Sequence, residues 1–302
     1  MRLATMLSET PGPNALGSLR DAIKAAADDG FSSAWMANIF GLDAITALAV
    51  AGAGIADIEL GTGVVPTYPR HPVTMAQQAI TAQLALEGRF TLGIGLSHQF
   101  VIEQMFGMDY AKPARHMSDY LDVLLPLLDG TPAAHTGTVS ANVTVSADTS
   151  QPVQTLIAAL APQMLKLAAT KAAGTVLWMA GAEAIRSHIV PSLQAANPDR
   201  AHRVVAGLPV CVTDDVEGTR AKADQIFAIY GQLPAYRAVL DRGGVAGPGA
   251  LAIVGDEDAV EAGLREVIEA GATDVMAAGF ATPGSTEAAR TSALLRRLIA
   301  DG

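Results

Sequence analysis

The stretch LGTGVVPTYPRHP, residues 60–72, decides the fold into which the rest of the chain must fit. It continues an apolar run from Ile58, passes through Gly61-Thr62-Gly63 and two valines, and then opens into a loop with three prolines. Isoleucine and valine favour a buried strand, whereas glycine inside a strand marks a bulge or a close approach to the backbone. The sequence therefore predicts a buried strand whose end is shaped, either for packing alone or so that a ligand can lie against it.

Seven other short apolar runs are similar to this strand, and helical segments lie between most of them. The eight predicted strands are 3–7, 33–37, 58–65, 90–94, 155–159, 175–179, 204–212 and 274–278. Before the last of them, Val260, Leu264 and Val267 recur with the period of a helix face. Alternating strands and helices indicate a parallel sheet of the α/β class. The count of eight favours a closed (β/α)8 TIM barrel over an open doubly wound sheet.

Two segments interrupt the alternation of strands and helices. Residues 131–152 are rich in Thr, Ser, Val and Asn, and predict a hairpin or an extended loop. Residues 232–249 contain Gly-Gly and Gly-Pro-Gly, and predict an inserted lobe. We expect one domain over residues 1–302, with both segments as insertions in the barrel.

The composition disfavours several classes of protein. The formal net charge is −10, whereas nucleic-acid binding requires a concentrated basic face. The single cysteine, Cys211, allows neither an intrachain disulfide nor a cysteine metal site. The apolar run 45–55 is too short to span a bilayer, and the first residues lack a signal-peptide core. We expect a soluble, cytoplasmic protein whose partner is a small molecule, not a nucleic acid or a membrane.

The loops that follow the strands build the working face of a (β/α)8 barrel. The positions that follow the eight predicted strands are 8–10, Asn38, 63–72, 96–98, 160–161, 180–181, Thr213 and 279–280. No HxH or HExxH pattern or carboxylate cluster stands there, so we predict no metal. Neither a lysine nor paired carboxylates stand there, which disfavours a Schiff-base aldolase and a glycosidase. An apolar, backbone-rich face suits a flat organic cofactor that supplies the reactivity itself.

Each candidate residue also has a purely structural interpretation. The two glycines of the opening stretch fit a bulge or tight packing as well as a ligand surface. His98 fits a loop histidine that is hydrogen-bonded to the backbone. Arg70 and His71 fit a solvated loop, and Trp178 fits ordinary packing.

Five stretches of the chain together resemble one known family. They are GFSSAWMANIFGLDAITALA, IELGTGVVPTYPRHPVTMAQQA, GRFTLGIGLSHQFVIE, YAKPARHMSDYLDVLLPLL and LIAALAPQMLKLAA with the later GTVLWMAG. In this order they resemble the luciferase-like flavin and deazaflavin oxidoreductases, above all the actinobacterial branch that uses coenzyme F420. The resemblance covers nearly the whole chain. It implies a (β/α)8 barrel, usually dimeric, that holds the deazaflavin at the mouth formed by the carboxyl ends of the strands.

The resemblance also implies a set of site residues. A bulge with a cis peptide bond at Gly63–Val64 would support the cofactor ring, and backbone N–H groups before and within a helix that starts at Pro162 would bind the phosphate of the cofactor tail. The implied cofactor-binding residues are Asn38, Gly63, Val64, Leu96, Ser97, His98, Leu160, Ala161, Gln163 and Met164. The implied catalytic residues are His98 and Asn38, with His98 as the proton donor.

The chain departs from a sugar-phosphate dehydrogenase of this family at several of these positions. That relative has an acidic residue and a histidine where Asn38 and Ile39 stand, and a carboxylate where His98 stands. It has two glycines where Leu160 and Ala161 stand. Ile39 cannot transfer a proton, and the Lys and Arg residues that would bind a sugar phosphate have no counterpart here, which disfavours that activity.

The sequence therefore predicts an F420-dependent oxidoreductase that transfers a hydride between the deazaflavin and a small organic substrate. Two alternatives remain open, an FMN-dependent monooxygenase on the same fold and a non-catalytic F420-binding protein. A cofactor-free isomerase or lyase is disfavoured, because neither a lysine nor paired carboxylates stand at the strand ends. The resemblance further implies a homodimer.

Overall fold

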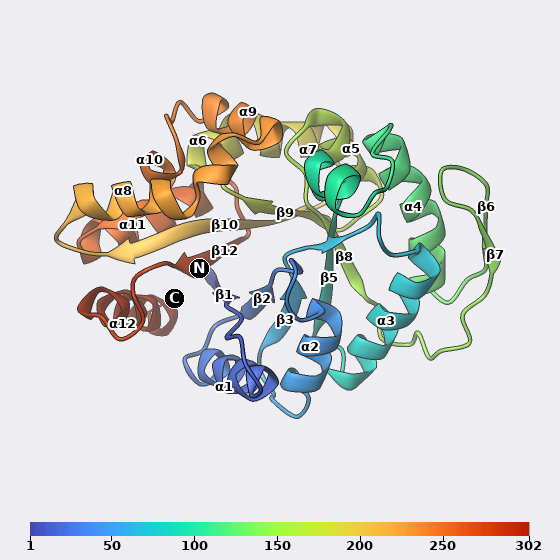
Figure 1. The fold of residues 1–302 in the computed structure, drawn as a ribbon, viewed down its shortest axis with the longest axis horizontal. Helices are drawn as coiled ribbons and strands as arrows, with labels where there is room; N and C mark the ends of the chain where they lie inside the picture. Colours follow the sequence, from blue (N-terminus) through green and yellow to red (C-terminus); the bar gives the residue numbers. More distant parts are fainter. Residues whose placement is uncertain (302) are drawn as a thin grey trace.

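Eight parallel strands close into a ring in the computed structural model, which describes residues 1–301 (Figure 1). In spatial order they are β1 (Arg2–Leu7), β2 (Ser33–Met36), β3 (Glu59–Thr62), β5 (Phe90–Gly95), β8 (Gln154–Ile157), β9 (Gly174–Trp178), β10 (Arg203–Val212) and β12 (Asp274–Gly279). The pairing of β12 with both β10 and β1 closes the ring. The predicted (β/α)8 barrel is confirmed, and each predicted strand overlaps one strand of the ring.

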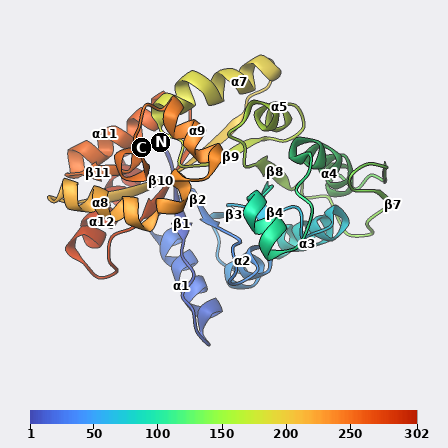
Figure 2. The same ribbon diagram turned by 45° about the horizontal axis from the view of Figure 1, so that its top comes forward.

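Helices cover the outside of this ring (Figures 1 and 2). They are α1 (Ala15–Asp28), α2 (Ala44–Gly52), α3 (Pro72–Ala85), α4 (Pro113–Leu128), α5 (Pro162–Thr170), α6 (Ala182–Ala184), α7 (Val190–Ala196), α8 (Val216–Ile226), α9 (Pro234–Arg242), α10 (Pro248–Leu251), α11 (Glu257–Glu269) and α12 (Thr286–Ala300), with short turns η1 (Val101–Met105), η2 (Ile185–Ile189) and η3 (Ala228–Gly231). In α11, the Asp256 side chain accepts a hydrogen bond from the Ala259 N–H at the helix start, and Val260, Leu264 and Val267 are buried. The predicted helix face is therefore the face that packs on the barrel.

The predicted strand 58–65 is broken at its centre by a bulge. β3 ends at Thr62, and the short β4 (Val65–Pro66) resumes the pairing with β5. Gly61 pairs with Thr91 and Val65 with Ile94, so four steps on one strand match three on the other. This is the register of a β-bulge. The peptide bond inside it, Gly63–Val64, is cis, as the resemblance implies.

Gly93 on the neighbouring strand makes room for this bulge. A Cβ atom at Gly93 would lie 1.9 Å from the carbonyl oxygen of Thr62, which no side chain can tolerate. The Thr62 hydroxyl replaces the lost ladder bonds, because it donates to the Gly93 carbonyl at 2.8 Å and accepts from the Gly93 N–H at 2.9 Å. The glycine of strand 90–94 is thus required by its neighbour's bulge.

The two interruptions of the alternation form separate substructures. Residues 131–152 contain the antiparallel hairpin of β6 (Ala133–His135) and β7 (Ala141–Val143), which lies at the right of Figure 1. Residues 232–249 contain α9 and the start of α10. A further strand, β11 (Ile253–Gly255), was not among the predicted strands, and it pairs with the end of the long β10.

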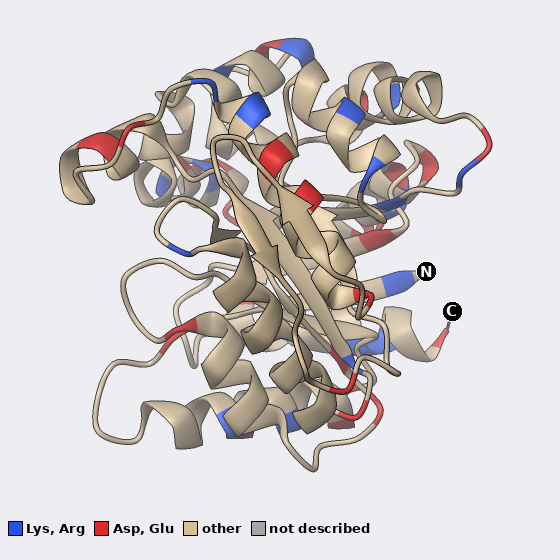
Figure 3. Cartoon of the chain, turned by 90° about the vertical axis from the view of Figure 1, so that its right-hand side faces the viewer, with Lys and Arg blue, Asp and Glu red and all other residues tan. Residues whose placement is uncertain are grey.

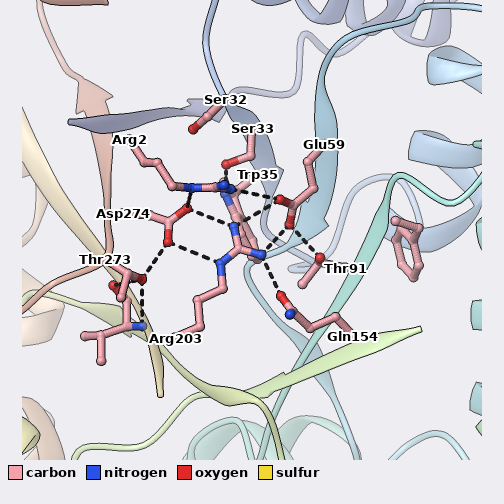
Figure 4. Close-up of polar contacts among 12 residues, drawn as sticks. Arg2, Ser32, Ser33, Trp35, Glu59, Thr91, Gln154, Arg203, Thr273 and Asp274 are labelled. Carbon is pink, nitrogen blue, oxygen red and sulfur yellow. Dashed lines mark hydrogen bonds and ion pairs between the residues drawn. The ribbon is translucent and has the colours of Figure 1, made fainter. Parts of the chain in front are cut away.

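Charged residues at the amino ends of four strands close the bottom of the barrel (Figure 4). The Arg203 guanidinium lies between Glu59 and Asp274, with nitrogen–oxygen distances of 2.6 and 2.9 Å. Arg2 contacts the same two carboxylates, and the Arg203 guanidinium carbon lies 5.6 Å from the ring centre of the fully buried Trp35. Every charge in this network therefore has an opposite charge beside it, which buried ions require.

The surface carries both signs of charge. Figure 3 shows Lys and Arg interspersed with Asp and Glu on the side of the molecule that bears the hairpin. Within residues 1–301, the structure contains no helix with both the length and the hydropathy needed to cross a bilayer.

Candidate active site

The residues implied by the resemblance gather on one half of the barrel mouth. Asn38 follows β2, Gly63 and Val64 follow β3, the segment 96–98 follows β5, and 160–161 follows β8. These four strands are consecutive neighbours in the ring, so their carboxyl ends lie side by side. The topology brings the predicted positions together. Their roles remain predictions.

The bulge presents backbone to the mouth. The Val64 side chain packs with the residues that fill the barrel interior, and a Cβ atom at Gly95 would lie 2.7 Å from it. A Cβ atom at Gly63, by contrast, would have its nearest neighbours 3.8 Å away, in Trp35. The bulge therefore turns its apolar side chain into the barrel interior, whereas Gly63 is partly exposed and a Cβ atom there would make an ordinary contact with Trp35.

The turn after β5 is fixed by a stack of rings. Ser97 has a left-handed backbone, with φ of 60°, and its carbonyl accepts a hydrogen bond from the Tyr110 hydroxyl at 3.3 Å. Tyr110 stacks on Tyr68 with ring centres 5.1 Å apart, and Tyr68 stacks on His116 at 4.0 Å. The sequence patterns did not single out the two tyrosines, and they indicated a solvated helix start for His116, which is buried. The three rings hold the carbonyl of the residue that precedes His98.

His98 is half-buried at the mouth, with its ring 5.8 Å from that of Tyr236. Burial lowers the pKa of His98 below its usual value of 6.5. The imidazole is therefore neutral at pH 7, ready to accept a proton and requiring prior protonation to donate one.

Asn38 already has a structural role. Its side-chain oxygen accepts a hydrogen bond from the Ala44 N–H at 3.0 Å, at the start of α2. A ligand can therefore be bound by the amide Nδ2 of Asn38, or by the second lone pair of its oxygen, without breaking this contact.

The start of α5 has the features of an anion-binding position. Ala161 precedes the helix and gives no side-chain cap, Pro162 has no N–H, and the first turn has no acidic residue. The N–H groups of Gln163 and Met164 lack a partner within the helix, since its first intrahelical bond runs from Leu165 to Ala161. Such N–H groups together with the helix dipole favour a phosphate.

A histidine that the sequence patterns did not indicate supports this loop. His188, in η2, contacts the Leu160 carbonyl oxygen through Nε2 at 2.9 Å, and it can only donate there. The backbone of Leu160, which with Ala161 replaces two glycines of the relative, is therefore held from outside the loop.

Arg70 and His71 have structural roles, but only His71 is exposed as a solvated loop residue would be, whereas the Arg70 side chain is 19% exposed. Arg70 pairs with Asp43, and its carbonyl accepts from the Tyr120 hydroxyl at 2.8 Å. The His71 side chain accepts from the Val73 N–H at 3.3 Å and so caps α3. Cys211 is buried, and burial raises its pKa, so its thiol stays protonated at neutral pH.

One group of three potential metal ligands lies in the described part of the chain, at Asp119, Asp122 and His135. Asp119 accepts from the Thr138 N–H at 2.7 Å, and Asp122 pairs with Lys171 at 2.6 Å. Both carboxylates are engaged by α4 and its neighbours. The group gives no reason to revise the prediction of no metal.

Comparison with known proteins gives a family and a fold. The family described as "Luciferase-like monooxygenase" matches residues 1–297. A Mycobacterium tuberculosis protein whose name assigns it as a coenzyme F420-dependent oxidoreductase is 34% identical over 102 residues. That match spans 34% of this chain and 29% of the relative, so it covers less than a third of the relative's length.

Solved structures resemble the whole chain. The coenzyme F420-dependent tetrahydromethanopterin reductase from Methanopyrus kandleri superposes with a TM-score of 0.80 and 21% identity, covering 99% of this chain and 97% of that one. The oxygenating component of 3,6-diketocamphane monooxygenase from Pseudomonas putida, bound to FMN, gives 0.75 and 14% identity, covering 98% and 96%. At these identities the likeness is one of fold.

Proposed function

Because the chain belongs to the luciferase-like monooxygenase family, we propose that it is an oxidoreductase that uses coenzyme F420 to transfer a hydride to or from a small organic substrate. One observation carries this proposal. The bulge at Gly63–Val64, the turn at Ser97–His98 and the uncapped start of α5 lie at the mouth on neighbouring strands. Together they offer a backbone surface for a flat ring and N–H donors for a phosphate.

The residues present fit such a cofactor. Gly63 is partly exposed and carries no side chain, so a ring can approach the backbone there, and the partners of the Gln163 and Met164 N–H groups have to come from outside the helix. The relative's glycines in the β8 loop are not needed for this, because the donors belong to the helix start. When bound, the deazaflavin supplies the two-electron chemistry. The chain supplies position, an apolar surface and a proton.

The proposed roles follow from the contacts. The Asn38 amide Nδ2 and the Ser97 backbone bind the polar edge of the ring. His98 moves the proton, and its neutral form accepts one when the substrate is an alcohol. The Gln163 and Met164 N–H groups bind the tail phosphate. His188 and Tyr110 are positioning residues for the β8 and β5 loops.

A fluorescence titration with F420 and with FMN tests the proposal. We expect saturable binding of F420, and Ala161→Asp should weaken it by at least about tenfold, because the carboxylate both caps α5 and repels the phosphate. Ala161→Asn has nearly the same shape and caps without the charge, so it should weaken binding less. Binding of neither cofactor to the wild-type chain would overturn the proposal.

The main alternative is an FMN-dependent monooxygenase, which the FMN-bound neighbour from Pseudomonas putida favours. It predicts tighter binding of FMN than of F420 in the same titration. A non-catalytic F420-binding protein predicts tight F420 binding without turnover of any substrate offered.

We further propose a homodimer that forms through α2 and α3. These two helices pack against each other and contain no Asp, Glu, Lys or Arg. Yet Val50 is 54% and Leu84 is 40% exposed, so the uncharged face includes apolar side chains in contact with solvent. An exposed face of this kind is typical of a surface that a partner covers.

Light scattering on the purified chain tests the dimer. We expect a dimer for the wild type and a monomer for the double variant Val50→Glu, Leu84→Glu, because each glutamate would be buried without a partner. Val143→Glu, on the exposed hairpin, is the control and should remain dimeric. A wild-type monomer at micromolar concentration would contradict the proposal.

A further inference from the structure

An unbroken series of aromatic rings lies along the other side of the mouth. We call it the aromatic wall, and it consists of Trp178, Phe227, Tyr230, Tyr236 and Phe280. Trp178 ends β9 and Phe280 follows β12, whereas the other three come from the segment that leads from α8 through η3 into α9. The wall therefore joins two strand ends to a segment that runs into the predicted insertion at 232–249.

The rings contact one another edge to face. Phe227 lies 5.9 Å from Phe280 and 5.8 Å from Trp178, with interplanar angles of 75° and 70°. Tyr230 lies 6.0 Å from Trp178 and 4.9 Å from Tyr236, at 69° and 73°. These are the favoured geometries of aromatic pairs.

The wall reaches the proposed proton-transfer group. Tyr236 is the ring that contacts His98, at 5.8 Å. All five rings of the wall, and His98, are partly exposed. Partly exposed rings that are fixed by one another present apolar surface to whatever lies at the mouth.

One hydrogen-bond donor of the wall is unused. Trp178 Nε1 is buried and makes no hydrogen bond with any group in residues 1–301. It lies near the Tyr230 hydroxyl, whose pKa burial raises and the indole N–H lowers, but the pair does not reach hydrogen-bond geometry. A buried donor without a partner costs stability, so a ligand acceptor that reaches it when the neighbouring Tyr230 ring moves aside would relieve that cost.

The wall offers little to a negative charge. Its rings are uncharged, and His98 beside it is neutral at pH 7 because burial lowers its pKa. The cation that shares a cavity with Phe280 is Lys222, and that cavity of about 290 Å³ also contains Asp215 and Glu287. An anionic substrate would lose hydration at the wall without gaining an unopposed cation.

We propose that the substrate of this site is a neutral, planar, aromatic or conjugated carbonyl compound that packs on the aromatic wall. The reaction of such a substrate rests on the proposed function, whereas its binding to the aromatic wall does not. The rings give area and edge-to-face contacts, and the Trp178 N–H gives one donor to the carbonyl. Tyr236 holds the substrate beside His98. The wall thus determines specificity, and a sugar phosphate is excluded by chemistry as well as by the missing basic residues.

Tryptophan fluorescence tests this binding without any turnover. The chain contains two tryptophans. Trp35 is fully buried beside Arg203, and Trp178 is in the wall. The full-length protein is titrated with 4-nitroacetophenone, a neutral planar ketone that quenches indole fluorescence. Two matched quenchers accompany it, the anionic 4-nitrobenzoate and the carbonyl-free 1-ethyl-4-nitrobenzene.

We expect saturable quenching with a Kd for the ketone at least about tenfold below that for the anion and severalfold below that for the ethyl compound. Trp178→Phe should abolish the saturable part and leave the Trp35 emission, which also reports that the variant folds. Tyr236→Ala keeps the reporter and should raise the Kd about 2–10-fold, the equivalent of one aromatic pair. Phe40→Ala, an exposed ring after β2, should leave the Kd unchanged.

Three results would overturn this inference: equal quenching by the ketone and the anion, saturable quenching that survives in Trp178→Phe, or a Tyr236→Ala variant that binds as the wild type does. The F420 titration separates these outcomes from a failure of the proposed function. A chain that binds the cofactor but not the ketone keeps its function and loses this substrate class. A chain that binds the ketone but neither cofactor keeps this substrate class and loses the proposed function.

Discussion

Arg203→Met is expected to lower the free energy of unfolding by about 3–5 kcal/mol, the usual cost of removing one partner from a buried ion pair. The Arg203 side chain is 14% exposed and neutralises Glu59 and Asp274, of which Asp274 is 1% exposed. Methionine fills the space over Trp35 but leaves both carboxylates facing only the half-exposed Arg2. Urea unfolding followed by circular dichroism measures the loss.

The pH dependence of this loss identifies its cause. Burial alone would raise the pKa of Asp274, but the hydrogen bonds and charge of Arg203 lower it below the usual 3.8. The stability that Asp274 contributes is therefore present above pH 3.8 and is lost as the pH falls through its lower folded pKa. In Arg203→Met the effect of burial on the pKa of Asp274 is no longer offset by Arg203, so Asp274 protonates at a higher pH. Acidification then neutralises the buried carboxylate and removes its cost to the stability of the variant. The difference in stability between wild type and variant should narrow between pH 7 and 4.

Arg290→Met is the matched control. Arg290 also contacts two carboxylates, Asp214 and Glu257, but this network is exposed, so its loss should change stability far less. A loss in Arg203→Met no larger than in the control, or a difference that stays constant with pH, would show that the bottom of the barrel does not depend on this ion network.

The strands of this fold could be predicted because each is a short apolar run that is buried on both faces. β11 could not be predicted in this way. Its residues, Ile253 to Gly255, form a run too short to distinguish from a loop, and its pairing partner is the overhanging end of β10. The break in the predicted strand 58–65 has a local signal, since two glycines stand where the bulge forms.

The positions of the Arg203 network in the sequence become informative only once the topology of the strands is known. Arg2, Glu59, Arg203 and Asp274 each occupy the first position of a strand. In a closed parallel barrel the first positions meet at one end, so four charges spread over 272 residues of sequence become one cluster. Without the closure of the ring, each would be an ordinary charged strand end.

The mouth of the barrel also has a part that the sequence could predict and a part that it could not. The positions on β2, β3, β5 and β8 were available to sequence reasoning because they follow recognisable strands within quoted motifs. The aromatic wall was not, because Phe227, Tyr230 and Tyr236 lie in a segment without strand or helix periodicity that could be assigned. Trp178 was interpreted as packing. Its ring contacts are with Phe227 and Tyr230, so its place in the wall could not be predicted while that segment was unassigned.

His98→Ala is expected to reduce kcat about 10²–10⁴-fold, the usual contribution of one general acid or base, while the Kd for F420 changes little. The proposed phosphate donors are at α5 and the proposed ring support is at Gly63, so neither depends on the imidazole. His98→Gln keeps a polar side chain of similar reach without a group that titrates, and it should be impaired nearly as much.

The pH profile separates a proton-transfer role of His98 from a structural one. Burial lowers the pKa of His98 below 6.5, so the neutral base persists to lower pH than in a free histidine. Oxidation of an alcohol should stay fast down to that lowered pKa and decline below it, whereas carbonyl reduction should decline as the pH rises above it. His98→Ala should remove this limb from both profiles. Tyr236→Phe should keep it, because burial raises the pKa of Tyr236 far above this range. If the limb survives in His98→Ala, or disappears in Tyr236→Phe, the proton is moved by another group and His98 serves only to pack against the wall.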